Sequence, residues 1–450
     1  MSRLTWVQPP DLLAHELVAS AADGKDVADV RRRWIDAGGQ AEAPAAGLGQ
    51  HGDPRIRALA VALLDELEAL PGDPELADSE PDELDAIVAA WSRPPITTEP
   101  GGDLDDRLLG AWTGRAAGCL LGKPVEKIPR EGIREILVSQ DRWPLTDWFT
   151  AEGLPAGVAA RWPWNRRSAG TSLAENIAGM PEDDDLNFPM LALDLLERHG
   201  HEVTTDQVAE SWLANLPGGR VFTAERVAYR NLLLGEVAPR TATHHNPFRE
   251  WIGAQIRTDV YGWANPGDPA AAARLAWRDA RLSHVRNGVY GAMFVAAMCA
   301  QAVVSDDVDA VLEAGLSVVP PKSRYADAVR FGADLGRRGV DTEKGLDALH
   351  GRYGHLHWVH VLNNAALTAY ALTSSDGDFS SAVCSAVMGG WDTDSVGATV
   401  GSVCGALAGA ERLPGRWTAP LRNTVASSLP GFDGIGFDEL ARRTAAVGAR

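Results

Sequence analysis

The first candidate for chemistry is an acidic segment that precedes an apolar run. It reads PEDDDLN, and its four consecutive acids are Glu182, Asp183, Asp184 and Asp185. Runs of acids most often lie on a solvated face. The alternative is that these carboxylates surround a cation. A helix that begins here stabilises each charge by only about 0.3–1 kcal/mol through its dipole, which is too little to gather four carboxylates in a partly buried site.

A second acidic segment with a similar design follows much later in the chain. In GGWDTDSVGA, a glycine pair precedes Asp392, Asp394 and Ser395, and a helix of small residues follows. Glycines let the backbone bend so that alternate oxygens point inward, and small residues let helices approach closely. Both segments offer only oxygen ligands, which suits Mg²⁺ or Mn²⁺ and disfavours zinc. We expect the two segments to converge on two ions about 3.5–4 Å apart, with ordinary caps and turns as the alternative.

Helices must position both segments, because strand signals are nearly absent from the chain. After residue 101 the sequence reads as helix after helix separated by Gly and Pro, with no internal repeat of fixed period. The predicted fold class is therefore all-α, with a compact multi-helix domain. The segment RPPITTEPGGD marks a boundary near Gly101. We expect a helical N-terminal extension over residues 1–100 and a catalytic domain over residues 101–450.

Composition and charge exclude several classes of function. The chain has 42 basic and 61 acidic residues, a net charge of −19, which argues against a nucleic-acid backbone or an anionic membrane as the main partner. Its longest apolar stretches are shorter than the roughly 20 residues of a membrane span and are expected to be buried helices. The N-terminus shows no secretory signal, so a cytoplasmic protein is expected. The four cysteines lack metal-binding spacing and are expected to be buried hydrophobic residues.

Together with two further segments, these motifs resemble the ADP-ribosylglycohydrolase family. The further segments are DRLLGAWTGRAAGCLLGKPVE at residues 106–126 and RDARLSHVRNGVYGAMFVAAM at residues 278–298. The four motifs stand in the family's order over approximately residues 103–422. The resemblance implies an all-α fold, a binuclear Mg²⁺ site that sometimes takes Mn²⁺, and hydrolysis of a ribosyl bond.

The resemblance also implies a set of metal ligands. The family's two metal motifs, commonly Thr-Asp-Asp and Asp-x-Asp-Ser/Thr, fall on Glu182, Asp183, Asp184, Asp392, Asp394 and Ser395. Glu182 departs from the pattern, because many members have Thr at this position. Its direct coordination of a metal is therefore less secure than that of the aspartates. The resemblance allows two roles for Asp185, either as a further metal ligand or as a hydrogen-bond acceptor outside the group of ligands.

Residues around the substrate follow from the other motifs. Glu126 matches an acid that lies near the metals in some relatives, although a Glu at this place could also lie at a surface helix end. The acids expected to act in catalysis are Glu126, Glu182 and Asp183. The residues expected to line the substrate pocket are Ser283, His284, Trp263, Asn265 and Trp391. A histidine near a helix is more often structural than catalytic, and most buried tryptophans simply fill space.

The predicted function is hydrolysis of an N- or O-ribosyl bond, most of all removal of ADP-ribose from a protein side chain. The metals would orient the ribose hydroxyls and activate water. The expected partner is an ADP-ribosylated protein or a small ribosyl substrate. Three alternatives stay open: a metal-dependent ribosidase or nucleosidase acting on a small metabolite, a non-catalytic binding or structural relative, and a two-metal phosphoesterase, which the order of the motifs disfavours.

Overall fold

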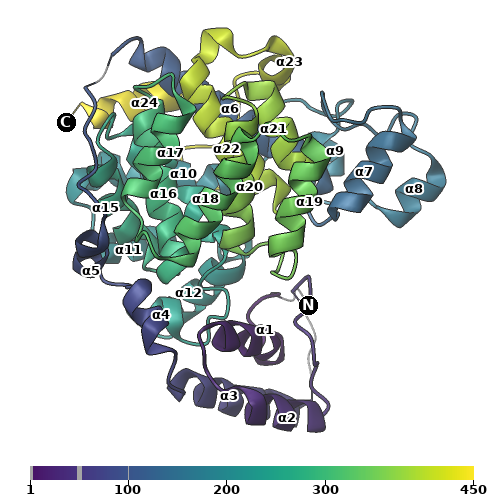
Figure 1. Ribbon diagram of the computed structural model, residues 1–450, viewed down its shortest axis with the longest axis vertical. Coiled ribbons are helices and arrows are strands. Elements are labelled where there is room, and N and C mark those ends of the chain that lie inside the picture. Colours follow the sequence, from purple (N-terminus) through teal and green to yellow (C-terminus); the bar gives the residue numbers. More distant parts are fainter. Residues whose placement is uncertain (1–3, 48–52, 100, 450) are drawn as a thin grey trace.

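The computed structural model of the chain describes residues 4–47, 53–99 and 101–449. Over these residues the chain forms helices and isolated β-bridges, with no sheet. The predicted all-α fold is therefore confirmed. Figure 1 shows a large helical body with helices α1, α2 and α3 of the N-terminal extension lying together below it.

The N-terminal extension contributes five helices: α1 (Pro9–Ala22), α2 (Ala28–Asp36), α3 (Pro54–Ala69), α4 (Pro74–Ser79) and α5 (Leu84–Ala90). The first half of the body contains α6 (Leu104–Gly122), the 3₁₀ helix η1 (Lys123–Val125), α7 (Arg130–Ser139), α8 (Ala156–Arg161), α9 (Ala169–Ser172), α10 (Asp184–His199), α11 (Thr205–Asn215), α12 (Thr223–Leu233), α13 (Arg240–Thr243), η4 (Ile252–Arg257), α14 (Asp259–Trp263) and α15 (Pro269–Ala280). The second half contains α16 (Arg286–Ala302), α17 (Val308–Ser317), α18 (Arg324–Arg337), α19 (Thr342–Tyr353), α20 (Val361–Ser374), α21 (Phe379–Met388), α22 (Thr393–Ala408), α23 (Gly415–Thr418) and α24 (Phe437–Gly448).

Helices α6 and α22 approach each other very closely. A Cβ atom added to Gly118 of α6 would lie 1.9 Å from the carbonyl oxygen of Gly397 of α22. The helices therefore touch backbone to backbone, which only glycine permits at these positions. They run antiparallel, and the Thr393 hydroxyl donates to the Gly122 carbonyl over 2.9 Å. This contact fixes the end of α6 beside the start of α22.

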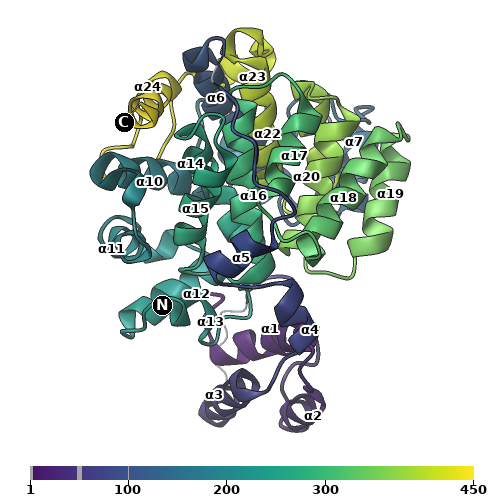
Figure 2. The same cartoon turned by 60° about the vertical axis from the view of Figure 1, so that its left-hand side comes forward.

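Helices α16 and α20 pack against α22 in the centre of the body, and Figures 1 and 2 show this group from two sides. Both α16 and α22 are almost entirely buried. The prediction that the two long apolar stretches are buried helices is therefore confirmed. The four cysteines are free and buried, as the sequence also predicts.

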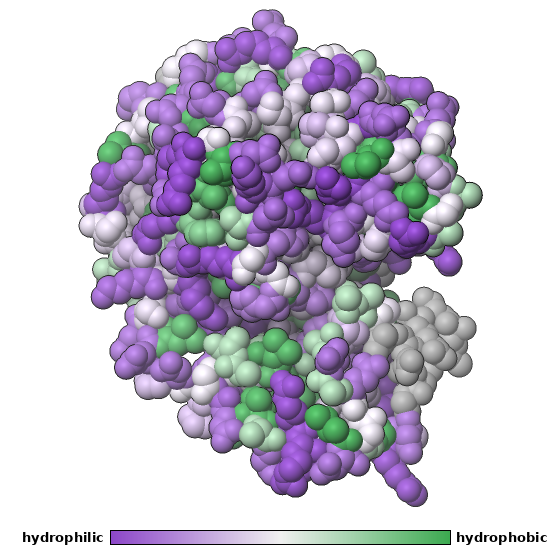
Figure 3. Space-filling view, turned by 45° about the vertical axis from the view of Figure 1, so that its right-hand side comes forward, coloured by the Kyte–Doolittle hydropathy of each residue, from purple (hydrophilic) through white to green (hydrophobic). Residues whose placement is uncertain are grey.

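The face of the protein drawn in Figure 3 is mainly polar. Figure 3 shows a face on which hydrophilic residues predominate and apolar residues lie singly or in small groups. Within the described ranges, every helix is too short or too polar to cross a bilayer.

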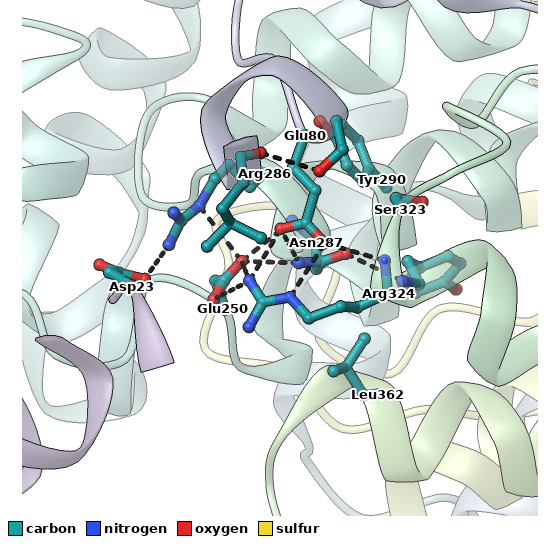
Figure 4. Close-up of polar contacts among 12 residues, drawn as sticks. Asp23, Glu80, Glu250, Arg286, Asn287, Tyr290, Ser323, Arg324 and Leu362 are labelled. Atoms are coloured by element: carbon teal, nitrogen blue, oxygen red, sulfur yellow. Dashed lines mark hydrogen bonds and ion pairs between the residues drawn. The ribbon is translucent and has the colours of Figure 1, made fainter. Parts of the chain in front are cut away.

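Buried ion pairs attach the N-terminal extension to the body. Figure 4 shows Glu80 of the extension beside Arg324 and Asn287 of the body. The two oxygens of Glu80 accept hydrogen bonds from Arg324 over 2.9 and 2.7 Å. On α1, Glu16 pairs with Arg249 over 2.9 Å. The extension is thus bound along much of its length, and its division from the body near residue 101 stays a prediction.

An aromatic cluster with two histidines completes this attachment. His15 of α1 is 4% exposed, and its ring lies 5.1 Å from that of Phe248 and 5.4 Å from that of Trp251. His357 stacks on Trp251 at 4.2 Å. Burial, followed by the nearby His357, lowers the pKa of His15 to about 3. Burial likewise lowers the pKa of His357 to about 4. Both imidazoles are therefore neutral when the protein is folded.

Replacing Gly118 with alanine tests the contact between α6 and α22. Gly118→Ala should lower the free energy of unfolding by about 1–3 kcal/mol or more, because the helices must separate to admit the methyl group. Gly157→Ala is the control, since a Cβ at Gly157 meets nothing within 4 Å. Chemical denaturation measures both variants. Equal stability of Gly118→Ala and the unsubstituted protein would contradict the packing.

The buried His15 makes stability depend on pH in a defined direction. Its pKa is lower in the folded state, so the unfolded chain binds more protons below its ordinary pKa of about 6.5. The stabilisation is complete above this pH, and about 1 kcal/mol is lost per pH unit as the pH falls toward 4. His15→Phe should reduce the slope of unfolding free energy against pH between pH 6.5 and 4.5. The matched control is His199→Gln, because the His199 side chain is exposed to solvent in the folded protein and its replacement should leave the slope unchanged. If His15→Phe has the same slope as the unsubstituted protein, the burial of His15 is contradicted.

Candidate active site

Helix α10 begins in the first acidic segment. Asp183 is its N-cap residue, and its Oδ1 accepts a hydrogen bond from the Asp185 N–H over 2.9 Å. Asp184 and Asp185 form the first turn, where the positive end of the helix dipole favours negative charge. The acids thus stand at a helix start, and Asp183 and Asp184 line the cavity described below.

Helix α22 begins in the second acidic segment. Gly390 has φ +72°, a conformation that favours glycine, and a Cβ there would lie 2.5 Å from the backbone nitrogen of Arg130. The Asp392 N–H donates to Oδ1 of Asn364 on α20 over 3.2 Å. The turn and this bond hold Asp392 and Asp394 at the entry of the helix, as the glycine pair in the sequence suggests.

The structure brings the two acidic segments together. The Ser395 hydroxyl donates to Oδ2 of Asp185 over 3.2 Å, which joins the starts of α10 and α22. Beside them is a cavity of about 660 Å³. Seven of the predicted site residues line it: Glu126, Glu182, Asp183, Asp184, Asp392, Asp394 and Ser395.

Three carboxyl groups in this cavity have raised pKa values. Burial, followed by the charges of Asp183 and Asp394, raises the pKa of Asp184 well above its ordinary value. Burial and the charge of Asp394 do the same for Asp392. Burial, followed by the charges of Glu126 and Asp183, raises the pKa of Asp394 to about 7. Negative charge is therefore concentrated here beyond what the surrounding protein neutralises, a condition that a bound cation would relieve.

Basic side chains of the protein form ion pairs with the neighbouring acids. Lys123, the first residue of η1, forms an ion pair with Asp183. Burial alone would raise the pKa of Asp183, but the charge and hydrogen bond of Lys123 lower it. Arg220 pairs with Oε2 of Glu182 over 2.9 Å. Neither partner was predicted from the sequence; Lys123 stands in the same GKPVE segment as Glu126, and its place directly after a helix of small residues was the available signal.

A buried arginine supports the site from behind. Arg115 of α6 is fully buried, and its Nε donates to the Asp185 carbonyl over 2.7 Å. Its Nη1 pairs with Asp259 over 3.0 Å, and its Nη2 lies 3.4 Å from Oδ1 of Asp185. Asp185 therefore accepts hydrogen bonds from Arg115 and Ser395, and its carboxylate lies within 4.8 Å of that of Asp183. A lone arginine within the small apolar residues of GRAAG was the sequence signal for this role.

Glu126 lies on the cavity wall just after η1. Its Oε2 accepts from the Asn165 amide over 2.5 Å, and its Oε1 lies 3.1 Å from the Lys127 ammonium. Its side chain is 20% exposed, so the carboxylate is open to the cavity rather than sealed within the protein.

The predicted Ser283-His284 pair lies outside this cavity. The Ser283 hydroxyl accepts from Arg257 over 2.9 Å and contacts Nδ1 of His284 over 2.8 Å. Arg257 also pairs with Glu225 over 2.6 Å. Both predicted residues are buried, so the pair belongs to a polar network beneath the cavity wall. Only Glu225 of this network lines the cavity.

The other three predicted substrate residues also lie elsewhere. Trp263 is fully buried, with its ring 4.9 Å from that of Trp112. The Asn265 amide donates to a backbone carbonyl one helical turn earlier. Trp391 stacks on His350 at 4.3 Å and is 5% exposed. These side chains pack the interior around the site and do not form its wall.

Arginines and aromatic side chains also line the cavity. They include Arg167, Arg220, Phe222 and Trp358. The guanidinium of Arg167 lies 5.7 Å from the centre of the Phe222 ring. A lining that combines acids with arginines and aromatic rings suits a ligand that has both a polyhydroxyl part and an anionic or aromatic part.

Fold and cavity together define an all-α protein with a carboxylate-lined pocket. The sequence model of the family described as ADP-ribosylglycohydrolase matches residues 100–449. The chain belongs to this glycohydrolase family, so the resemblance in the sequence is confirmed. One similar solved structure, described as an ADP-ribosylglycohydrolase-related protein complex, is 22% identical, covers 77% of this chain and 97% of its own, and has a TM-score of 0.47. No curated protein matches the chain.

Arg115 provides a test of the support beneath the site. Arg115→Met should lower the free energy of unfolding by about 3–5 kcal/mol, because it leaves Asp185 and Asp259 buried without their partner. Arg337→Met is the matched control: its guanidinium is 43% exposed, and its loss should cost at most about 1 kcal/mol. Urea denaturation measures both. Similar losses for the two variants would contradict a supporting role for Arg115.

Proposed function

We propose that the chain is a divalent-cation-dependent hydrolase that cleaves an N- or O-ribosyl bond, and that its substrate is ADP-ribose attached to a protein side chain. The observation that supports this most is the group of carboxylates that line one cavity, those of buried Asp392 and Asp394 and of half-buried Asp184. Family membership supports the reaction class.

The donor set fits a hard cation. All three carboxylates offer oxygen, and their raised pKa values are the sign of unneutralised charge. We propose Mg²⁺ as the ion, with Mn²⁺ as the alternative. When bound, such an ion orients sugar hydroxyls and lowers the pKa of water.

Glu126 is the residue that we propose to move the proton. Its carboxylate lies on the cavity wall and is oriented by Asn165, which is the arrangement that a general base or acid requires. Glu182 and Asp183, the other acids predicted to act in catalysis, hold salt bridges to Arg220 and Lys123. We propose that these two position the site. The remaining carboxylates would favour the positive charge that develops at the anomeric carbon.

The arginines and aromatic rings of the lining suit the rest of ADP-ribose. Arg167 and Arg220 can donate to a diphosphate, and Phe222 and Trp358 offer rings against which a base can stack. A volume of about 660 Å³ lies in the usual range for a ligand of this size. We propose no substrate contact for Ser283, His284, Trp263, Asn265 or Trp391, which lie outside the cavity lining.

One observation favours the alternative of a ribosidase that acts on a small metabolite. Arg220, one of the two arginines on the wall, is already paired with Glu182 over 2.9 Å. If that pair persists when substrate binds, only Arg167 is left for a diphosphate, and a smaller riboside would fit better.

Turnover assays distinguish these functions. The full chain, with Mg²⁺, Mn²⁺ or EDTA, is assayed on ADP-ribosyl-arginine, ADP-ribosyl-serine and simple N-ribosides. We expect metal-dependent release of ADP-ribose, and a loss of about 10³-fold or more in kcat/KM for Asp184→Asn and Asp392→Asn, because the cation contributes several kcal/mol to transition-state stabilisation.

The matched control is Asp334→Asn on the surface of α18, which should keep full activity. Turnover of N-ribosides alone would favour the ribosidase. An absence of metal-dependent turnover on all the substrates would overturn the proposal.

A further inference from the structure

We infer that the active-site cavity holds one divalent cation, and that the ammonium group of Lys123 stands in the place of a second. This inference rests on the proposed function and departs from the two ions that the sequence motifs imply. It depends on which carboxylate oxygens the protein has already engaged.

Lys123 is fixed deep in the site. It follows directly on α6, and its side chain is 9% exposed. Its ammonium contacts Oδ2 of Asp183 and lies 3.5 Å from the Glu182 carbonyl oxygen. Its ion pair with Asp183 already neutralises an acid that the motif assigns to a metal.

Both oxygens of Asp183 are engaged by the protein. Oδ1 accepts the hydrogen bond from the Asp185 N–H that caps α10, over 2.9 Å. Oδ2 accepts from Lys123. A metal at Asp183 would lie beside the ammonium, where the two positive charges repel each other strongly in a buried setting.

Glu182 is engaged in the same way. Its Oε1 accepts from the Asn187 amide over 3.1 Å and from the Ser428 N–H over 3.0 Å. Its Oε2 pairs with Arg220 over 2.9 Å. The residue that departs from the family pattern thus has three donors from the protein and is held away from metal coordination.

Three acids remain for a cation. Asp184, Asp392 and Asp394 form no ion pair with an arginine or lysine of the described residues. One divalent ion neutralises two of their three negative charges. The same ion would also orient the bound substrate. The geometry therefore provides one complete ligand group and one position filled by Lys123.

Counting bound Mn²⁺ tests the inference without measuring activity. The full chain is titrated with Mn²⁺ by calorimetry, and the bound ion is recorded by electron paramagnetic resonance. We expect one equivalent and the six-line spectrum of an isolated ion. Lys123→Met removes the ammonium and should raise the count to two, with the broadened spectrum of a coupled pair. Lys123→Arg keeps the positive charge and should bind one.

Lys127→Met is the matched control, because Lys127 lies on the same cavity wall but pairs with Glu126 and is 50% exposed; it should still bind one ion. Two coupled ions in the unsubstituted chain would overturn the inference and leave the proposed hydrolase intact. No bound ion would overturn both. A single ion in folded Lys123→Met, with folding checked by circular dichroism, would overturn the role of Lys123. If Lys123→Met does not fold, the number of Mn²⁺ ions bound by the unsubstituted chain and by Lys123→Arg decides whether the inference holds.

Discussion

Burying several carboxylates together requires positive charge nearby, and this constraint governs the structure around the active site. An unpaired buried charge is strongly unfavourable, so the protein pairs nearly all of its buried acids with arginine. Asp185 and Asp259 share Arg115, and Glu225 and Asp279 share Arg257. The acids of the candidate site are the exception: Asp392 and Asp394 are buried, Asp184 is half-buried, and all three have raised pKa values and no arginine partner among the described residues.

The backbone contact between α6 and α22 explains how these acids meet a lysine. Because the glycines of both helices touch, the end of α6 is fixed against the first turn of α22 by the bond from Thr393 to Gly122. Lys123 is the next residue along the chain, and it lines the same cavity as Asp394. Two unit charges 4 Å apart interact by about 4 kcal/mol near a protein surface, and an ammonium beside a divalent ion would experience about twice that repulsion. The helix contact therefore determines both where the acids gather and how many cations can bind beside them.

Helix starts could be predicted from the sequence, whereas the partners of side chains could not. The acids at residues 182–185 and 392–394 each lie at the start of a helix, and this local pattern together with the family resemblance predicted that they converge. Ser283 and His284 were predicted at the substrate from the family resemblance alone. Burial beside Arg257 accounts for them equally well, and the arginine lies 26 residues from Ser283 in the sequence. Only tertiary packing determines which of these two environments a polar pair occupies.

The N-terminal extension contributes to the lining of the cavity, although the family match begins at residue 100. Trp6 lines the active-site cavity, and Thr5 accepts a hydrogen bond from Arg226 through its carbonyl oxygen over 3.0 Å. On the same rim, the Trp358 indole donates to the Ala45 carbonyl over 2.8 Å. Ion pairs of Glu16 and Glu80 fix the extension to the body. The shape of the cavity therefore depends in part on residues outside the family domain.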